Sequence, residues 1–192
     1  MYTIENNTKY ELIIKNSKFI TILLKINNNN NVENNLLSIK KEYPDATHYC
    51  YAYIVNDIKK SSDDGEPSGT AGVPILKVLE NNNLTNILCV VIRYFGGIKL
   101  GANGLVRAYT KSCANAIKET NLKELVDGVN LTITFPYNRL KEIDYLLKDI
   151  NINSKRYDDL ITYNIDIELS FLDIIKNNHL EYIINNYLKI EK

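Results

Sequence analysis

Residues 86–109 read NILCVVIRYFGGIKLGANGLVRAY, and this stretch decides the fold. The first ten residues are almost wholly apolar, which predicts a buried central strand with a helix on at least one face. GGIKLG follows as a loop. Residues 102–119 then carry the clearest helical pattern in the chain, with one apolar stripe formed by Leu105, Val106, Tyr109, Cys113, Ala116 and Ile117. We therefore expect a glycine-rich turn between a buried strand and a long helix.

Strands and helices alternate upstream of this stretch. We expect strands at YELIIK (10–15), KFITILLKI (18–26) and THYCYAYIV (47–55), with KNS as the turn between the first two. Apolar spacing predicts a helix over residues 32–42. Residues 57–69 read as a polar loop, and a second helix is expected from Thr70, acting as its N-cap, to about residue 80.

The pattern changes near residues 127–128, where a βαββαβ order begins. The expected strands are 129–135, 152–157, 160–169 and 187–191, and the expected helices are 138–149 and 171–184. This order is the ferredoxin-like, split-βαβ pattern. We therefore predict an α+β chain with two domains, 1–125 and 126–192.

Composition narrows the possible functions. Lys and Arg number 23, as do Asp and Glu, so the chain is no general polyanion binder and any nucleic-acid contact must come from a local patch. The three cysteines form no CxxC pair and are expected to be reduced core thiols. The first residues do not resemble a signal peptide, and no apolar run is long enough for a membrane span. We therefore expect a cytoplasmic protein without membrane contact.

The glycines are concentrated in one region, since seven of the eight lie between residues 65 and 104. Glycines between a strand and a helix start can turn backbone N–H groups outward, and the helix start favours anions. The candidate phosphate- or nucleic-acid-binding residues are Arg93, Gly96, Gly97, Lys99, Gly101, Asn103 and Arg107. The spacing matches neither GxGxxG nor a P-loop, so a nucleotide-cofactor motif is not indicated. The alternative is a tight strand–helix connection.

A second candidate site is DDGEPSGTAG (63–72), together with a nearby histidine. Its candidate functional residues are His48, Asp63, Asp64 and Glu66. The carboxylates could form an acidic surface for a basic partner, a solvated turn, or an internal pair with Arg93 or Arg107. His48 could act with them as a general base. No second ligand cluster completes a metal shell, so we expect no metal and no cofactor.

Long motifs in these regions resemble the YigZ/Impact family, in its bacterial two-domain form. They are ATHYCYAY, SDDGEPSGTAGVPIL and VVIRYFGGIKLGANGLVRAYTKS. Two departures are Val73, where a basic or polar residue is common, and Asn103, where glycine is common. The resemblance implies an N-terminal domain like the second domain of ribosomal protein S-five and domain IV of elongation factor G. It implies that the C-terminal domain is like the ferredoxin-like domains of that factor.

The resemblance also implies a role in translation, because eukaryotic Impact proteins regulate translation. Our first hypothesis is a non-enzymatic binding protein whose partner is RNA, the ribosome or a translation factor, with no reading of DNA sequence. The alternative is a hydrolase-like enzyme that uses His48 with the three carboxylates on a small phosphorylated or peptide substrate. A third hypothesis is a protein-interaction module whose acidic loop binds a basic partner. The residues favour binding over catalysis.

Overall fold

The computed structural model describes residues 1–192, which form two compact units, Met1–Lys123 and Glu124–Lys192. The first unit contains a five-stranded sheet in the order β2-β3-β6-β4-β5, and all neighbouring strands are antiparallel. The bounds are β2 Thr8–Ile14, β3 Ser17–Lys25, β4 His48–Val55, β5 Ile58–Ser62 and β6 Ile87–Tyr94. A short β1 (Tyr2–Ile4) precedes them, and its Tyr2 bridges Leu84.

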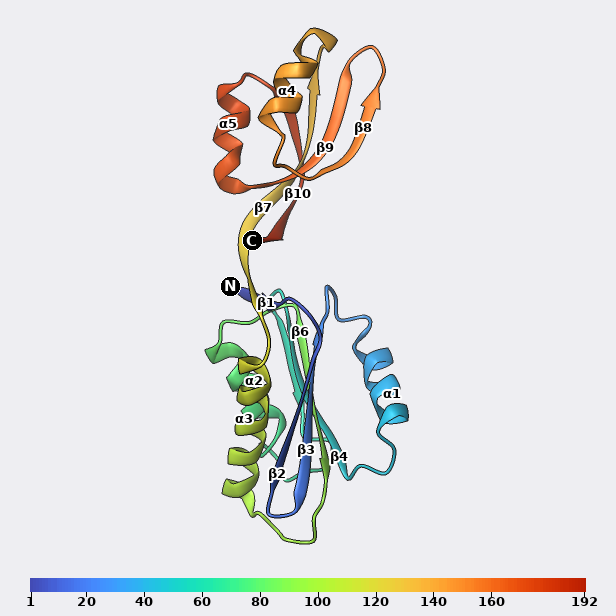
Figure 1. Ribbon diagram of the computed structural model, residues 1–192, viewed down its shortest axis with the longest axis vertical. Coiled ribbons are helices and arrows are strands. Elements are labelled where there is room, and N and C mark those ends of the chain that lie inside the picture. Colours follow the sequence, from blue (N-terminus) through green and yellow to red (C-terminus); the bar gives the residue numbers. More distant parts are fainter. The chain divides into compact units, whose positions relative to one another are not determined.

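Helices cover both faces of this sheet (Figure 1). Helix α1 (Val32–Glu42) lies on one face, and α2 (Gly72–Asn81) and α3 (Ala102–Lys118) lie on the other. The side chains of β6 alternate between the two cores, with Leu88, Val90 and Ile92 on the α1 side. Ile87, Cys89 and Val91 lie on the α2–α3 side. The predicted buried central strand is confirmed, and its unbroken apolar run follows from burial on both faces.

The prediction of a polar loop over 57–69 is wrong in part, because this segment contains strand β5. This strand lies at the edge of the sheet and pairs only with β4. Its sequence, IKKSS, has no apolar alternation, and Lys59 and Lys60 are exposed. Edge strands of this kind carry lysines that discourage pairing with other chains, so the hydrophobic pattern gave no sign of the strand.

The second unit has the predicted βαββαβ order. The bounds are β7 Leu122–Phe135, α4 Leu140–Leu146, β8 Ile152–Tyr157, β9 Ile161–Glu168, α5 Leu172–Asn177 and β10 Glu181–Glu191. Short 3-10 helices, η1 Tyr137–Arg139 and η2 Leu169–Phe171, precede α4 and α5. The strands form an antiparallel sheet in the order β10-β7-β9-β8, and both helices pack on one face (Figure 1). Alternate residues of β7 and β9 fill the core beneath them.

The two predicted helices of this unit are too long. The helix expected over 138–149 is α4 with its 3-10 turn, and the one expected over 171–184 ends at Asn177. His179 has φ +49°, and the N–H of Leu180 donates to the carbonyl of Ile175. This left-handed turn is a Schellman-type helix end. The apolar residues of EYIINNYLKI therefore belong to a strand, although their spacing also fits a helix.

No helix of the chain is both long enough and apolar enough to cross a bilayer.

Candidate functional site

The two sequence motifs meet at one pocket of about 350 Å³ in the first unit. We call residues 63–72 the acidic loop and residues 95–101 the glycine-rich loop. The part of the lining before β6 consists of Thr47, His48, Glu66 and Pro67. Arg93 at the end of β6, the glycine-rich loop and the first turn of α3 supply Phe95, Lys99, Leu100, Gly101, Ala102 and Leu105. The register of the strands brings these residues together, because Arg93 pairs with Phe19 of β3 and with His48 of β4.

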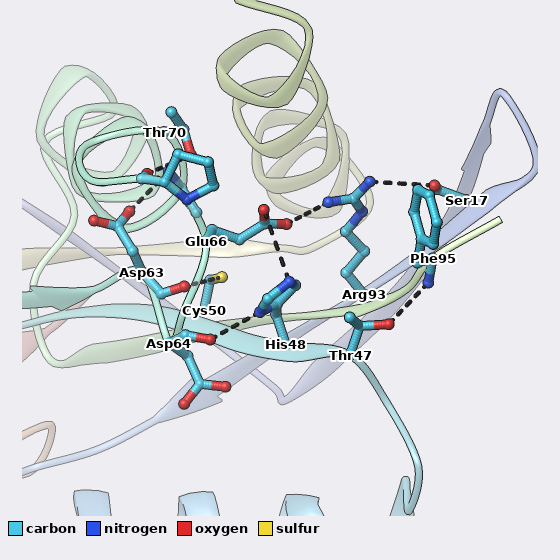
Figure 2. A network of polar contacts seen from close by, with 12 residues as sticks. Ser17, Thr47, His48, Cys50, Asp63, Asp64, Glu66, Thr70, Arg93 and Phe95 are labelled. Carbon is cyan, nitrogen blue, oxygen red and sulfur yellow. Dashed lines mark hydrogen bonds and ion pairs between the residues drawn. The ribbon is translucent and has the colours of Figure 1, made fainter. Parts of the chain in front are cut away.

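A buried ion pair forms the base of the site (Figure 2). Arg93 Nη1 donates to Glu66 Oε1 at 2.5 Å, and the side chains are only 6% and 3% exposed. The guanidinium also lies 5.5 Å from the ring centres of both Phe19 and Phe95. Tyr109 Oη donates to the same Glu66 oxygen at 2.8 Å. Among the alternatives for the carboxylates, internal pairing with Arg93 is therefore what the structure contains, and Glu66 is the partner.

His48 stands beside this pair. Its Nδ1 lies 2.8 Å from the carbonyl oxygen of Asp64. Since a carbonyl can only accept, Nδ1 carries the hydrogen and the other ring nitrogen is directed at Glu66. His48 Nε2 lies 3.8 Å from Glu66 Oε2, which is beyond a hydrogen bond. His48 and Glu66 are thus the only members of the predicted acid–base group that face each other across the pocket lining.

Asp63 has a different task, because it caps helix α2. Its Oδ1 accepts from the N–H groups of Ala71 and Gly72, at 2.9 and 2.8 Å, and its Oδ2 accepts from Gly69 at 2.8 Å. Burial raises the pKa of Asp63, but these three backbone donors outweigh it, so the pKa lies below its ordinary value. The predicted Thr70 cap is wrong: the Thr70 hydroxyl instead donates to the carbonyl of Pro67 at 2.6 Å.

Asp64 is also held within the protein. Its Oδ2 accepts from the N–H of Tyr49 at 2.7 Å, and its Oδ1 lies 3.6 Å from Lys40 Nζ. The three carboxylates therefore diverge, and the expected cluster of His48 with Asp63, Asp64 and Glu66 is not formed (Figure 2). No group of three or more His, Cys, Asp or Glu side chains is placed to hold a metal ion.

A chain of protonated groups lies behind Glu66. The Cys50 thiol lies 2.9 Å from the Asp63 carbonyl and 3.3 Å from Tyr109 Oη. Burial raises the pKa of Cys50 to about 12, and burial likewise raises the pKa of Tyr109. Both groups therefore stay neutral, so Cys50 is a core thiol and Tyr109 supports the Glu66 carboxylate.

The glycine-rich loop is anchored at its start and open beyond it. The N–H of Phe95 donates to Thr47 Oγ1 at 3.0 Å, and that of Gly96 donates to Ser17 Oγ at 3.2 Å. A Cβ on Gly96 would lie 2.0 Å from the backbone of Asn16, so only glycine fits there. Gly97 and Gly101 have open space around them and φ of +83° and +71°. Phe95, Ile98 and Lys99 are exposed.

The start of α3 completes the pocket. Gly101 is the N-cap residue, and no side chain caps the helix. Asn103 and Arg107 are exposed on its first turns, and Arg107 Nε donates to the carbonyl of Asn103 at 3.2 Å. The predicted phosphate-binding set therefore divides into four groups. Arg93 is buried and paired, and Gly96 and Gly97 shape the loop. Lys99 and Gly101 line the pocket, whereas Asn103 and Arg107 are exposed on the first turns of α3 outside its lining.

Sequence reasoning missed several residues of the site. Ser17 lies outside the quoted motifs, Thr47 and Pro67 lie within them but were given no role, and Phe95 was assigned only to the strand. Tyr109 was assigned to the helix core, where its ring does lie, but its hydroxyl also reaches Glu66. A buried tyrosine needs a partner for its hydroxyl, and that requirement was the one available signal.

Residues 15–117 match the Impact N-terminal domain, and this range contains the whole site. The chain belongs to the Impact family. The resemblance inferred from the motifs is thus confirmed. The Impact family member YvyE of Bacillus subtilis is 39% identical over 160 residues, covering 78% of this chain and 74% of that protein. The Impact family member YigZ of Escherichia coli is 37% identical over 139 residues, covering 70% and 68%.

A solved structure extends the likeness beyond the Impact N-terminal domain. It is described as the crystal structure of a hypothetical protein, and it is similar to this Impact family chain with a TM-score of 0.69 and 27% identity. The similarity covers 96% of this chain and 97% of the other. It therefore includes the second unit as well as the first, and it supports the α+β fold along the chain.

Proposed function

We propose that this Impact family protein is a non-enzymatic binding protein of the translation apparatus. It contacts RNA through the glycine-rich loop and the start of α3. The observation that carries the proposal is the unequal distribution of charge at the pocket. Glu66 and Arg93 neutralise each other inside, while Lys99 is exposed at the mouth.

The start of α3 adds to this positive mouth. Its first N–H groups have no side-chain cap, and a helix start carries a partial positive charge that favours phosphate. Arg107 lies on the second turn of the same helix and is exposed. Cationic side chains and backbone amides of this kind bind phosphates without reading bases. They form a local patch on a chain with no net charge.

Family membership supports the link to translation, since the resemblance to eukaryotic Impact proteins, which regulate translation, implies a role in that process. The expected likeness of the first unit to the second domain of ribosomal protein S-five and to elongation factor G domain IV points the same way. So does the ferredoxin-like order of the second unit. These likenesses are analogies of fold, and the charge at the site carries the proposal.

The internal roles of the carboxylates favour binding over catalysis. A hydrolase would need an acid–base set around a substrate. Asp63 caps a helix, Asp64 binds a backbone N–H, and Glu66 neutralises a buried arginine. The acidic loop offers a basic protein partner little free charge for the same reason.

Binding over a salt series tests the proposal. We expect the protein to bind ribosomes and structured RNA at low salt, with an affinity that falls steeply as salt rises. Lys99→Ala and Arg107→Ala should each weaken binding and reduce the slope of log K against log salt by about one. Lys77→Ala, at an exposed position on α2, is the matched control and should bind like wild type. Absence of binding by the wild type at low salt would overturn the proposal.

A further inference from the structure

Two polar atoms in the pocket lining lack hydrogen bonds. Glu66 Oε1 accepts from Arg93 and Tyr109, but Glu66 Oε2 has only His48 Nε2 near it, at 3.8 Å. Arg93 Nε is buried and has no partner. Both residues are buried, and both line the pocket. A carboxylate oxygen that lines a pocket without a hydrogen bond can accept one from a ligand. Glu66 Oε2 therefore favours a ligand that presents an N–H group, and Arg93 Nε favours one that presents an acceptor.

The rest of the lining is suited to a flat ring. Apolar surface comes from Pro67, Leu100 and Leu105. Phe95 is 45% exposed, although the Arg93 guanidinium lies 5.5 Å from the centre of its ring. A volume of about 350 Å³ is within the range of small-ligand pockets. Proteins that bind single-stranded RNA stack unpaired bases on aromatic side chains of this type.

The pocket has positive charge at its mouth and a carboxylate oxygen inside, and this difference should bind a ligand in one orientation. Lys99 and the start of α3 favour a phosphate at the mouth, while Glu66 Oε2 favours a donor inside. We propose that the pocket holds one unpaired nucleotide of RNA, with its phosphate at Lys99 and its base beside Phe95, so that an exocyclic amine donates to Glu66 Oε2. This inference rests on the proposed RNA-binding function and specifies what the site accepts.

The amine requirement predicts a base preference. Adenine, cytosine and guanine carry an exocyclic amine, whereas uracil presents carbonyl oxygens at the corresponding positions. A carbonyl oxygen against the Glu66 carboxylate would leave both acceptors unpaired. We therefore expect single-stranded oligoadenylate and oligocytidylate to bind about tenfold or more tightly than oligouridylate of the same length.

The experiment measures the affinity of the full chain for these three oligonucleotides and for AMP and UMP, by calorimetry or fluorescence anisotropy. Phe95→Ala should weaken oligoadenylate binding about tenfold and should reduce the preference over oligouridylate. Glu66→Gln should remove the base preference, provided that the circular dichroism spectrum shows a folded protein. Tyr187→Ala removes an aromatic side chain that is 70% exposed in the second unit, and it is the control.

The outcomes separate this inference from the proposed function. Equal binding of all three oligonucleotides, unchanged in Phe95→Ala but weakened in Lys99→Ala, would overturn the nucleotide pocket and leave RNA binding intact. Binding of AMP over UMP without RNA binding would overturn both the RNA-binding function and RNA as the source of the nucleotide, and would identify a free-nucleotide site. Absence of binding by every oligonucleotide and mononucleotide would overturn both.

Discussion

The acidic loop and the glycine-rich loop line the same pocket, yet their polar groups have different partners. In the acidic loop, the carboxylates of Asp63 and Asp64 bind backbone N–H groups, and Glu66 binds Arg93 and Tyr109. In the glycine-rich loop, Phe95, Ile98 and Lys99 are all exposed beyond the anchor at Gly96. One loop is held by contacts with the protein, and the other offers side chains to solvent.

The difference shows that a run of charge in a sequence does not by itself make a charged surface. Turns and helix starts leave backbone donors without partners, and carboxylates nearby in the chain are the acceptors that satisfy them. A glycine-rich segment next to a buried strand can also have a defined conformation. Here the hydrogen bond from Gly96 to Ser17 anchors the segment, and Gly97 and Gly101 adopt positive φ. The acidic loop therefore contributes mainly to stability, with Glu66 Oε2 as its one atom proposed to meet a ligand, and the glycine-rich loop supplies the phosphate-binding surface.

Removal of the Glu66 carboxylate should have the largest effect on stability. Glu66→Ala leaves the Arg93 guanidinium buried without its counter-charge, which costs about 3–5 kcal/mol. Urea denaturation followed by circular dichroism measures this loss. In the double variant Glu66→Ala/Arg93→Met, no buried charge remains, so stability should partly return. A loss below about 1 kcal/mol in the single variant would contradict the internal role of the acidic loop.

Asp63→Ala should cost less, about 2 kcal/mol, because it removes the α2 cap and leaves three N–H groups without acceptors. The pKa of Asp63 is lowered in the folded state, so its ionised form contributes stability that is present above the unfolded pKa of about 4 and is lost as pH falls through the folded pKa. The difference in unfolding free energy between wild type and Asp63→Asn should therefore shrink below about pH 4. A constant difference down to pH 2 would argue against the cap.

Gly97 tests the rigid shape of the glycine-rich loop. It has φ +83° and open space around it, so Gly97→Ala should cost about 1 kcal/mol from backbone strain alone. Gly97→Asn should cost less, since asparagine tolerates left-handed backbone. Thermal unfolding of the two variants gives the comparison. If alanine and asparagine have equal effects, the loop is not fixed in this conformation.

Lys99→Ala should have the smallest effect on stability, within about 0.5 kcal/mol, because its side chain is exposed and has no ion-pair partner within the chain. The same urea denaturation serves as the measurement. An effect as large as that of Asp63→Ala would place Lys99 among the residues that hold the fold and would remove the contrast between the two loops.

The predictions from sequence succeeded where the signal was local. Strand β6 and helix α3 have unambiguous patterns, because burial on both strand faces and on one helix face dictates their residues over many positions. Strand β5 had no such pattern, since an exposed edge strand needs only its backbone to pair. The segment from Glu181 onward had an apolar pattern that fitted a helix or a strand, and the left-handed His179 decided between them.

The sequence predicted several residues of the site but not how they pair, for a related reason. The motifs named His48, Glu66, Arg93 and Lys99, and the structure brings all four to one pocket. Sequence spacing does not reveal which carboxylate pairs with Arg93, because that choice depends on the register of β3, β6 and β4 and on the path of a loop 27 residues earlier. Helix capping by Asp63 from eight residues before Ala71 lies equally outside local rules.

Chemical-shift mapping by NMR would test the central claim most directly. A ¹⁵N-labelled sample of the full chain is titrated with single-stranded oligoadenylate at low salt, and the backbone amide shifts are followed. We expect the largest changes at Phe95, in residues 96–101 and in the first two turns of α3, with the amides of Ala71 and Gly72 little changed because Asp63 already holds them. Changes concentrated in residues 63–72, or only in the second unit, would contradict the assignment of binding to the glycine-rich loop.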